Sequence, residues 1–190
     1  MYMEAILKRE IVTNKTICRI FAAFTFVILT ALGAYVRIPL PFTPVPITLQ
    51  TFFVLLGAAL LGRGLGVITQ AAYLTFGIAG LSIFTGAGYG FAYLLGPTGG
   101  YLLGFVLAAY FGGKCLDSER GGLLYVFAVL FAADLILLAC GVLWLKAAFG
   151  LSLAKAILLG LLPFIPGDIL KALAAAHIYL RLKPRLEKVL

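Results

Sequence analysis

Charged side chains are scarce in this sequence. They make up 12% of its 190 residues, whereas about a quarter is usual for a soluble domain. Hydrophobic residues make up 63% of the chain, and its mean hydropathy is +1.12. Several apolar stretches reach the roughly 20 residues that a helix needs to cross a bilayer. The composition excludes an ordinary soluble domain and predicts an all-α integral membrane protein.

Long polar linkers are also absent, so we expect a single membrane domain over residues 1–190. The formal net charge is +8, which by itself is compatible with nucleic-acid binding. The basic residues, however, lie between apolar runs and do not gather on one soluble face. We therefore expect the protein to lie in a lipid bilayer and not to bind nucleic acid.

Metal-binding and disulfide patterns are missing. The three cysteines, Cys18, Cys115 and Cys140, are scattered and match neither a zinc spacing nor a disulfide framework. The single histidine, His177, has no acidic or cysteine cluster at a ligand spacing beside it. The sequence therefore predicts no metal site and no cofactor.

Motifs for nucleotide binding and for catalysis are missing as well. Gly113 and Lys114 lack the upstream glycine and the following Ser or Thr of a phosphate-binding loop. The chain contains no G-x-G-x-x-G, H-E-x-x-H or G-x-S-x-G pattern. We expect a protein that is not an enzyme and that does not hydrolyse ATP itself.

The apolar runs predict six membrane-spanning helices. Residues 1–15 are mixed in charge and are expected to form a cytoplasmic or interfacial segment. A short helix or interfacial turn is expected at about 151–162, and the polar stretch "GGKCLDSERGG" is expected to be a loop. The six helices are predicted at about 16–36, 47–61, 65–79, 97–112, 123–146 and 166–182.

An even number of helices places both termini on one side of the membrane. With that side inside, every Lys and Arg lies at the inner face except Arg37, Lys146, Lys155 and Lys171. Cytoplasmic segments are enriched in Lys and Arg, so the asymmetry predicts cytoplasmic termini. The proline-rich loop "RIPLPFTPVPIT", the segment 80–96 and Asp168 then share the outer face.

Small residues recur every fourth position in the fourth predicted helix. They are Gly96, Gly100, Gly104, Ala108 and Gly112. Such a stripe lets another helix approach closely, and packing inside the bundle is the expected use.

The segment 80–101 combines hydroxyl groups, aromatic rings and glycines. Thr85, Tyr89, Tyr93 and Thr98 offer hydroxyls, and glycines such as Gly86 let backbone N–H groups approach a ligand. These residues are candidates for a pocket that binds a small, partly flat molecule with a polar head. An aromatic belt at the membrane interface has a similar composition, so the composition alone leaves both interpretations open.

Three ionisable residues lie at membrane depth, where each costs roughly 2.5–3.5 kcal/mol on insertion scales. Asp134 stands in the middle of its helix, either as a hydrogen-bonded structural acid or as a group with an ion or proton role. Asp168 and Lys171 are three residues apart on one helical face, where their side chains can meet. They form either a self-neutralising salt bridge or a donor and acceptor for a polar ligand.

Three motifs carry a resemblance to a known family. "PFTPVPITLQTF", "GPTGGYLLGF" and "PFIPGDILK" occur far apart and in this order. Together they resemble the BioY family, the biotin-binding membrane subunits, or S components, of energy-coupling factor (ECF) vitamin transporters. The resemblance covers about residues 30–185.

The resemblance implies a six-helix subunit of a prokaryotic cell membrane that captures biotin from outside. Its implied partners are a transmembrane coupling subunit and two cytoplasmic ATPases. It places the family's ligand-binding acid and base at Asp168 and Lys171, with Gln50 and the loop residues Thr85–Tyr93 completing the pocket. Asp168 would accept a ureido N–H, and Lys171 would bind either the ureido oxygen or the carboxylate.

The family's partner-docking pattern differs in this chain. S components present an A-x-x-x-A face on their first helix, and this sequence has no strict A-x-x-x-A there. It has the row Ala22, Phe26, Thr30 and Ala34 and a second row of Ala23, Val27 and Ala31. One of these rows is a candidate docking face.

Three other functions stay open at this point. They are an S component for another vitamin, an intramembrane enzyme, and a structural or channel subunit. The enzyme requires a catalytic constellation, and the sequence shows no nucleophile–base pair or metal cluster.

Overall fold

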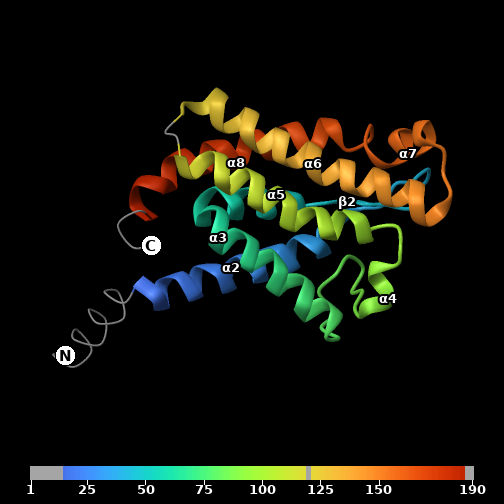
Figure 1. Cartoon of the computed structure of the whole chain (residues 1–190), viewed down its shortest axis with the longest axis horizontal. Helices are drawn as coiled ribbons and strands as arrows, with labels where there is room; N and C mark the ends of the chain where they lie inside the picture. Colours follow the sequence, from blue (N-terminus) through green and yellow to red (C-terminus); the bar gives the residue numbers. More distant parts are fainter. Residues whose placement is uncertain (1–14, 119–120, 187–190) are drawn as a thin grey trace.

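A computed structural model describes residues 15–118 and 121–186 of the chain (Figure 1). The segment expected at 1–15 therefore lies outside the described residues, apart from its last residue. Long helices dominate, and the elements in chain order are α2 (Lys15–Tyr35), β1 (Arg37–Ile38), β2 (Ile47–Thr48), α3 (Gln50–Ile78), α4 (Phe91–Leu94), α5 (Gly99–Ser118), α6 (Leu123–Phe149), α7 (Leu153–Gly160) and α8 (Ile165–Leu186).

Four of the described helices are long and apolar enough to cross a membrane, namely α2, α3, α5 and α6. A fifth crossing results if α7 and α8, which meet at a bend of 53°, count as one broken span. Large apolar side chains point outward, including Phe21 at 66% exposure and Leu124 at 80%. In water this surface would be costly, so the chain is a multi-pass membrane protein built of helices.

Helix α3 is broken into two antiparallel halves. Gly62 interrupts it with a φ of 72° and a ψ of 179°, a conformation that favours glycine. The Gln50 side chain, near the start, donates to the hydroxyl of Tyr73 at 2.6 Å. On an unbroken helix these residues would be about 35 Å apart. The break coincides with the boundary that the sequence placed between its second and third helices.

The polar stretch "GGKCLDSERGG" is helical over its first half. The sequence placed the end of its fourth helix near 112, whereas α5 continues to Ser118. Gly113 does not terminate the helix, because it serves a close contact: a Cβ there would lie 2.5 Å from the backbone nitrogen of Arg63. The expectation of a loop was wrong here because a glycine that permits close packing looks the same in sequence as a turn glycine.

The row of small residues on α5 packs inside the chain, as the sequence predicted. A Cβ on Gly100 would lie 2.2 Å from Cβ of Trp144, and one on Gly104 would lie 3.0 Å from Cα of Leu137. Both contacts are with α6. The stripe therefore sets the distance between α5 and α6, the helices that form two walls of the cavity described below.

The first of the two rows on α2 also packs inside the chain. Phe26, Thr30 and Ala34 are all buried, and the ring of Phe26 lies against Gly57 of α3. This row is therefore not an available docking face. The outward side of α2 is formed by large apolar residues, among them Phe21, Phe24 and Leu32.

The connecting segments that contain β2, α4 and α7 gather at one end of the molecule. In Figure 1, α2 begins and α8 ends on the left, whereas β2, α4 and α7 lie on the right. Hydrogen bonds join these segments: Thr43 Oγ1 donates to the carbonyl of Leu159 at 2.8 Å, and Trp144 Nε1 donates to that of Gly96 at 3.0 Å. The proline-rich loop, the segment 80–96 and the start of α8 therefore share one face.

Candidate functional site

A cavity lies beneath these connecting segments, between α3, α5, α6 and α8. Its walls are largely apolar or aromatic: Val45, Pro46, Tyr93, Tyr101, Leu102, Phe105, Leu137, Leu138 and Phe164. A smaller set of polar side chains converges on it: Thr48, Gln50, Thr51, Thr85, Thr98, Asp168 and Lys171. Apolar walls with a few placed polar groups are typical of a small-molecule site.

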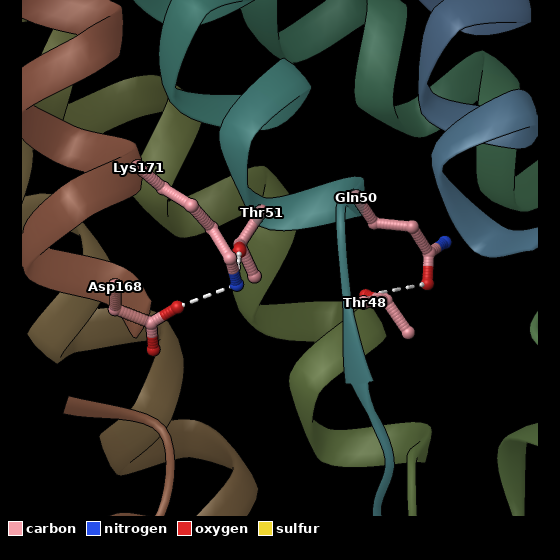
Figure 2. A network of polar contacts seen from close by, with 5 residues as sticks. All are labelled: Thr48, Gln50, Thr51, Asp168 and Lys171. Carbon is pink, nitrogen blue, oxygen red and sulfur yellow. Dashed lines mark hydrogen bonds and ion pairs between the residues drawn. The ribbon is translucent and has the colours of Figure 1, made fainter. Parts of the chain in front are cut away.

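The charged pair, Asp168 and Lys171, lines this cavity from α8. Lys171 Nζ donates to Asp168 Oδ1 at 2.7 Å and to Thr51 Oγ1 at 2.9 Å. The Asp168 side chain is 1% exposed and that of Lys171 12%. Figure 2 shows Lys171 reaching from α8 toward Thr51 at the start of α3. The pair thus ties the two helices together across the cavity.

Local sequence explains why Asp168 sits where it does. Pro166 lies in the first turn of α8, where its fixed φ suits a helix and its missing N–H costs no hydrogen bond. Asp168 is in the same turn, where a carboxylate is stabilised by the positive end of the helix dipole. Lys171 follows one turn later on the same face.

One carboxylate oxygen of this pair is unused. Among the described residues, Asp168 Oδ2 is buried and has no hydrogen-bond partner. Lys171 has three N–H donors, two of which are used within the chain. One acceptor and one donor of the pair therefore remain for a ligand. A buried acceptor without a hydrogen bond destabilises the protein, and a ligand that donates to it removes this penalty.

Gln50 forms a second polar network on the opposite side of the cavity. Its Oε1 accepts from Thr85 Oγ1 at 2.8 Å and from Thr48 Oγ1 at 3.3 Å. Its Nε2 donates to the hydroxyl of Tyr73, which in turn donates to the carbonyl of Ile83 at 2.9 Å. Figure 2 shows Gln50 and Thr48 beside each other, on the far side of Thr51 from the charged pair. This network holds the loop after α3 against the start of α3.

Aromatic stacking fixes the same loop. The ring of Phe84 is fully buried and lies between Tyr73 and Tyr93, with ring centroids 5.6 Å and 5.1 Å away. The Tyr93 hydroxyl donates to the carbonyl of Thr85 at 2.9 Å. Gly88 is required here, because a Cβ would lie 2.1 Å from the Tyr93 ring. The loop is thus an ordered wall that presents Thr85 and Tyr93 to the cavity.

The structure brings six of the eight residues singled out from the sequence to this cavity: Gln50, Thr85, Tyr93, Thr98, Asp168 and Lys171. Gly86 and Tyr89 lie outside its lining. Tyr89 is 60% exposed, and Gly86 is covered by the guanidinium of Arg37, whose Nη1 would be 2.6 Å from a Cβ there.

Sequence reasoning missed several lining residues. Tyr101, Leu102 and Phe105 recur at helical spacing after Thr98, so an amphipathic stripe on α5 could have identified them. Phe164 lies within the recognised "PFIPGDILK" motif. Thr51 gave no signal of its own, because its partner Lys171 is 120 residues away in sequence.

The cavity volume is about 40 Å³. A water molecule takes roughly 30 Å³ in the liquid, and pockets for small ligands are typically about 300–1,000 Å³. A bicyclic ligand therefore requires part of the wall to move. The walls formed by loops, around Val45 and Thr85, are among the parts not held within a long helix.

Among the residues that the structure describes, no group of three or more His, Cys, Asp or Glu side chains could hold a metal ion. The chemistry of the cavity is instead that of hydrogen bonding and apolar contact.

Comparisons with known proteins agree on one family. The BioY family's sequence model matches residues 8–188. A probable biotin transporter BioY of Pyrococcus horikoshii is 39% identical over 158 residues, which are 83% of this chain and 91% of that protein. The biotin transporter BioY of Thermotoga maritima is 39% identical over 170 residues, 87% of this chain and 95% of that protein.

A solved structure has the same fold. The crystal structure of the S component for biotin from an ECF-type ABC transporter superposes with a TM-score of 0.84 at 27% sequence identity. The match covers 90% of this chain and 94% of that one.

Proposed function

The chain belongs to the BioY family, and we propose that it is the membrane subunit that binds biotin for uptake by an ECF-type transporter. The observation that carries this function is the buried Asp168–Lys171 pair, which faces an aromatic cavity with an acceptor and a donor unused. Biotin has a cyclic urea whose N–H and C=O groups are adjacent. It therefore offers one donor and one acceptor to the pair, which has one acceptor and one donor unused.

The geometry favours one orientation of the ligand. Asp168 Oδ2 accepts a ureido N–H, and the third N–H of Lys171 donates to the ureido oxygen. Lys171 is already paired with Asp168 at 2.7 Å, so its charge is largely neutralised and a second carboxylate has less to gain there. The apolar bicycle then packs against the rings of Tyr93, Tyr101 and Phe105, and the valerate tail points toward the loops.

Binding requires a lid. The proline-rich loop and the segment 80–93 form the cavity walls nearest the connecting end of the molecule, and they must open to admit biotin. Gln50 holds the closed position, because its side chain bonds Thr85 of the lid and Tyr73 of α3. Closure would then exclude water from the ureido contacts and strengthen them.

We further propose the topology and the assembly. The two halves of α3 are counted as separate crossings, which with α2, α5, α6 and α8 makes six and leaves the termini in the cytoplasm of a prokaryotic cell. All 190 residues form one membrane domain. The cavity then opens outward. Release is driven by a transmembrane coupling subunit and two cytoplasmic ATPases, since the sequence carries no nucleotide-binding motif.

Direct titration tests the function. The purified chain is titrated with biotin while the fluorescence of Trp144, the only tryptophan, and the melting temperature are followed. Trp144 reports on the site because its indole N–H holds the carbonyl of Gly96, next to the lid. We expect saturable binding of one biotin and a rise in melting temperature. Riboflavin and thiamine serve as matched controls; binding of either in place of biotin would mean a different vitamin.

Biotin methyl ester tests the orientation. If the ureido group meets Asp168 and Lys171, the ester retains most of the affinity. A loss of affinity for the ester that disappears in Lys171→Met would instead show that Lys171 binds the carboxylate.

A further inference from the structure

Asp134 is a buried acid that does not line the cavity. It lies in the middle of α6 and is 0% exposed. Neither of its carboxyl oxygens has a hydrogen-bond partner among the described residues. Of those residues, the charged groups that interact with it are Asp168 and Lys171, across the contact between α6 and α8.

Three unpaired carboxyl oxygens thus occur in one place. They are both oxygens of Asp134 and Oδ2 of Asp168. Asp168 Oδ1 is already bonded to Lys171, which is bonded in turn to Thr51. Two carboxylates that face each other cannot both accept unless a proton lies between them.

The charge balance points the same way. With both acids ionised, the cluster holds two negative charges and one positive charge, and both carboxyl groups are buried. Burying an unpaired charge is very costly, and a group in this position takes up a proton instead. Two adjacent carboxyl groups that share one proton are a known solution to this repulsion. One proton makes the cluster of Asp134, Asp168 and Lys171 neutral.

We propose that Asp134 is protonated and donates a hydrogen bond to Oδ2 of Asp168, so that it acts as a positioning residue for ligand binding. The inference rests on the proposed function in so far as Asp168 is the ligand's acceptor. It defines a continuous chain of hydrogen bonds from Asp134 on α6 through Asp168 and Lys171 on α8 to Thr51 on α3.

The consequence for binding is preorganisation. A carboxylate oxygen has two acceptor positions, so Asp168 Oδ2 can accept from Asp134 and still accept a ureido N–H. With Asp134 and Lys171 each holding one oxygen, the Asp168 carboxylate cannot rotate away from the cavity. The Asp168 carboxylate is therefore already fixed before the ligand binds, which lowers the entropic cost of binding.

Two variants of the full-length protein separate this role from simple packing. Asp134→Asn keeps an N–H donor toward Asp168, whereas Asp134→Leu keeps a similar branched shape and loses the donor. We expect Asp134→Asn to bind biotin within about threefold of the unmodified protein. We expect Asp134→Leu to bind roughly tenfold to a hundredfold more weakly, the range for a lost buried hydrogen bond. Asp117 lies on α5, where its carboxylate accepts from the backbone N–H of Arg63 at 3.1 Å, away from the cavity. Asp117→Asn is therefore the matched control and leaves binding unchanged.

Infrared spectroscopy of the ligand-free protein reads the proton directly. The C=O stretching band of a protonated carboxylic acid should be present in the unmodified protein and in Asp117→Asn, and lost in Asp134→Asn. This measurement needs neither biotin nor the Leu variant, so it decides the point even if that variant does not fold.

Two results would overturn the inference: no protonated-acid band in the ligand-free protein, or Asp134→Asn binding as weakly as Asp134→Leu. Absence of biotin binding by the unmodified protein, with the band present, would refute the proposed function and leave the shared proton standing.

Discussion

Two polar networks face the same cavity, and they differ in whether a buried oxygen is left without a hydrogen-bond partner among the described residues. On the α3 side, Gln50 Oε1 accepts two bonds and Nε2 donates one, all to groups of the chain. On the α8 side, apart from the proposed bond from Asp134, Asp168 Oδ2 has no partner among the described residues, and they leave one N–H of Lys171 unused. The first network therefore mainly stabilises the fold and the lid. The second offers a ligand the hydrogen bonds that contribute most to its affinity.

Asp168→Asn should have the largest effect on binding. It removes the charged acceptor of the ureido N–H and leaves the Lys171 ammonium without its partner, and losing a charge-assisted buried bond costs about 1–3 kcal/mol or more. We expect biotin affinity to fall by roughly a hundredfold, measured by titration, together with a lower melting temperature. Unchanged affinity would reduce the pair to a structural salt bridge.

Lys171→Met should have the next largest effect. Methionine keeps much of the aliphatic volume, so the change isolates the loss of three N–H donors. Because Asp168 would then be a buried carboxylate with no cation beside it, we expect about a tenfold or greater loss of affinity and a lower melting temperature. Replacing both residues by Leu and Met should restore melting temperature but not binding; recovery of binding would contradict the ligand role.

Gln50→Leu should act on the lid more than on the ligand. It leaves the hydroxyls of Thr85 and Tyr73 each short of a partner, at a cost of about 1–3 kcal/mol in unfolding free energy. Because the closed loop loses this tie, we expect faster dissociation of biotin with little change in the association rate, measured by stopped-flow fluorescence of Trp144. A slower association with unchanged dissociation would show that Gln50 does not hold the closed lid.

Thr51→Val tests the link between α3 and α8. The change is nearly isosteric and removes one acceptor from Lys171, whose bond to Asp168 remains. We expect a loss of about threefold to tenfold in affinity, in keeping with roughly 0.5–1.5 kcal/mol for one hydrogen bond. A loss as large as that of Lys171→Met would show that Thr51 contacts the ligand itself.

Tyr89→Ala should have the smallest effect. Tyr89 is exposed and lies outside the cavity lining, so affinity should stay within about twofold of the unmodified chain. Tyr93→Ala is the paired control and should weaken binding clearly, since its ring lines the cavity and stacks on Phe84. Equal losses for both tyrosines would mean that the loop rearranges on binding.

Much of the site was visible in the sequence because its signals are local. The spacing of Asp168 and Lys171 alone places both on one face of a helix, and the glycines and tyrosines of 80–101 indicated a wall. Gly86 and Tyr89 belong to the same stretch and share its composition, yet they lie outside the cavity. Composition identifies a segment but does not tell which of its side chains turn inward.

The ends of the helices were likewise predicted only in part. Gly62 does mark a break, whereas Gly113 lies within a continuous helix against Arg63. The two glycines look alike in sequence. Each would bring a Cβ within 2.5 Å of a neighbour, so only the backbone distinguishes them: Gly62 has a φ of 72°, whereas Gly113 keeps the helix intact.

The sequence by itself determined a helical membrane protein, most of its helices, the pairing of Asp168 with Lys171 and the resemblance to the BioY family. These follow from hydropathy, residue spacing and short motifs, all of which act over a few turns of chain. Only the tertiary structure decided that Lys171 reaches Thr51, that Gln50 ties Tyr73 to Thr85, and that Asp134 faces Asp168. Those partners are set by how helices rotate and cross when their small residues pack, and no local pattern encodes that geometry.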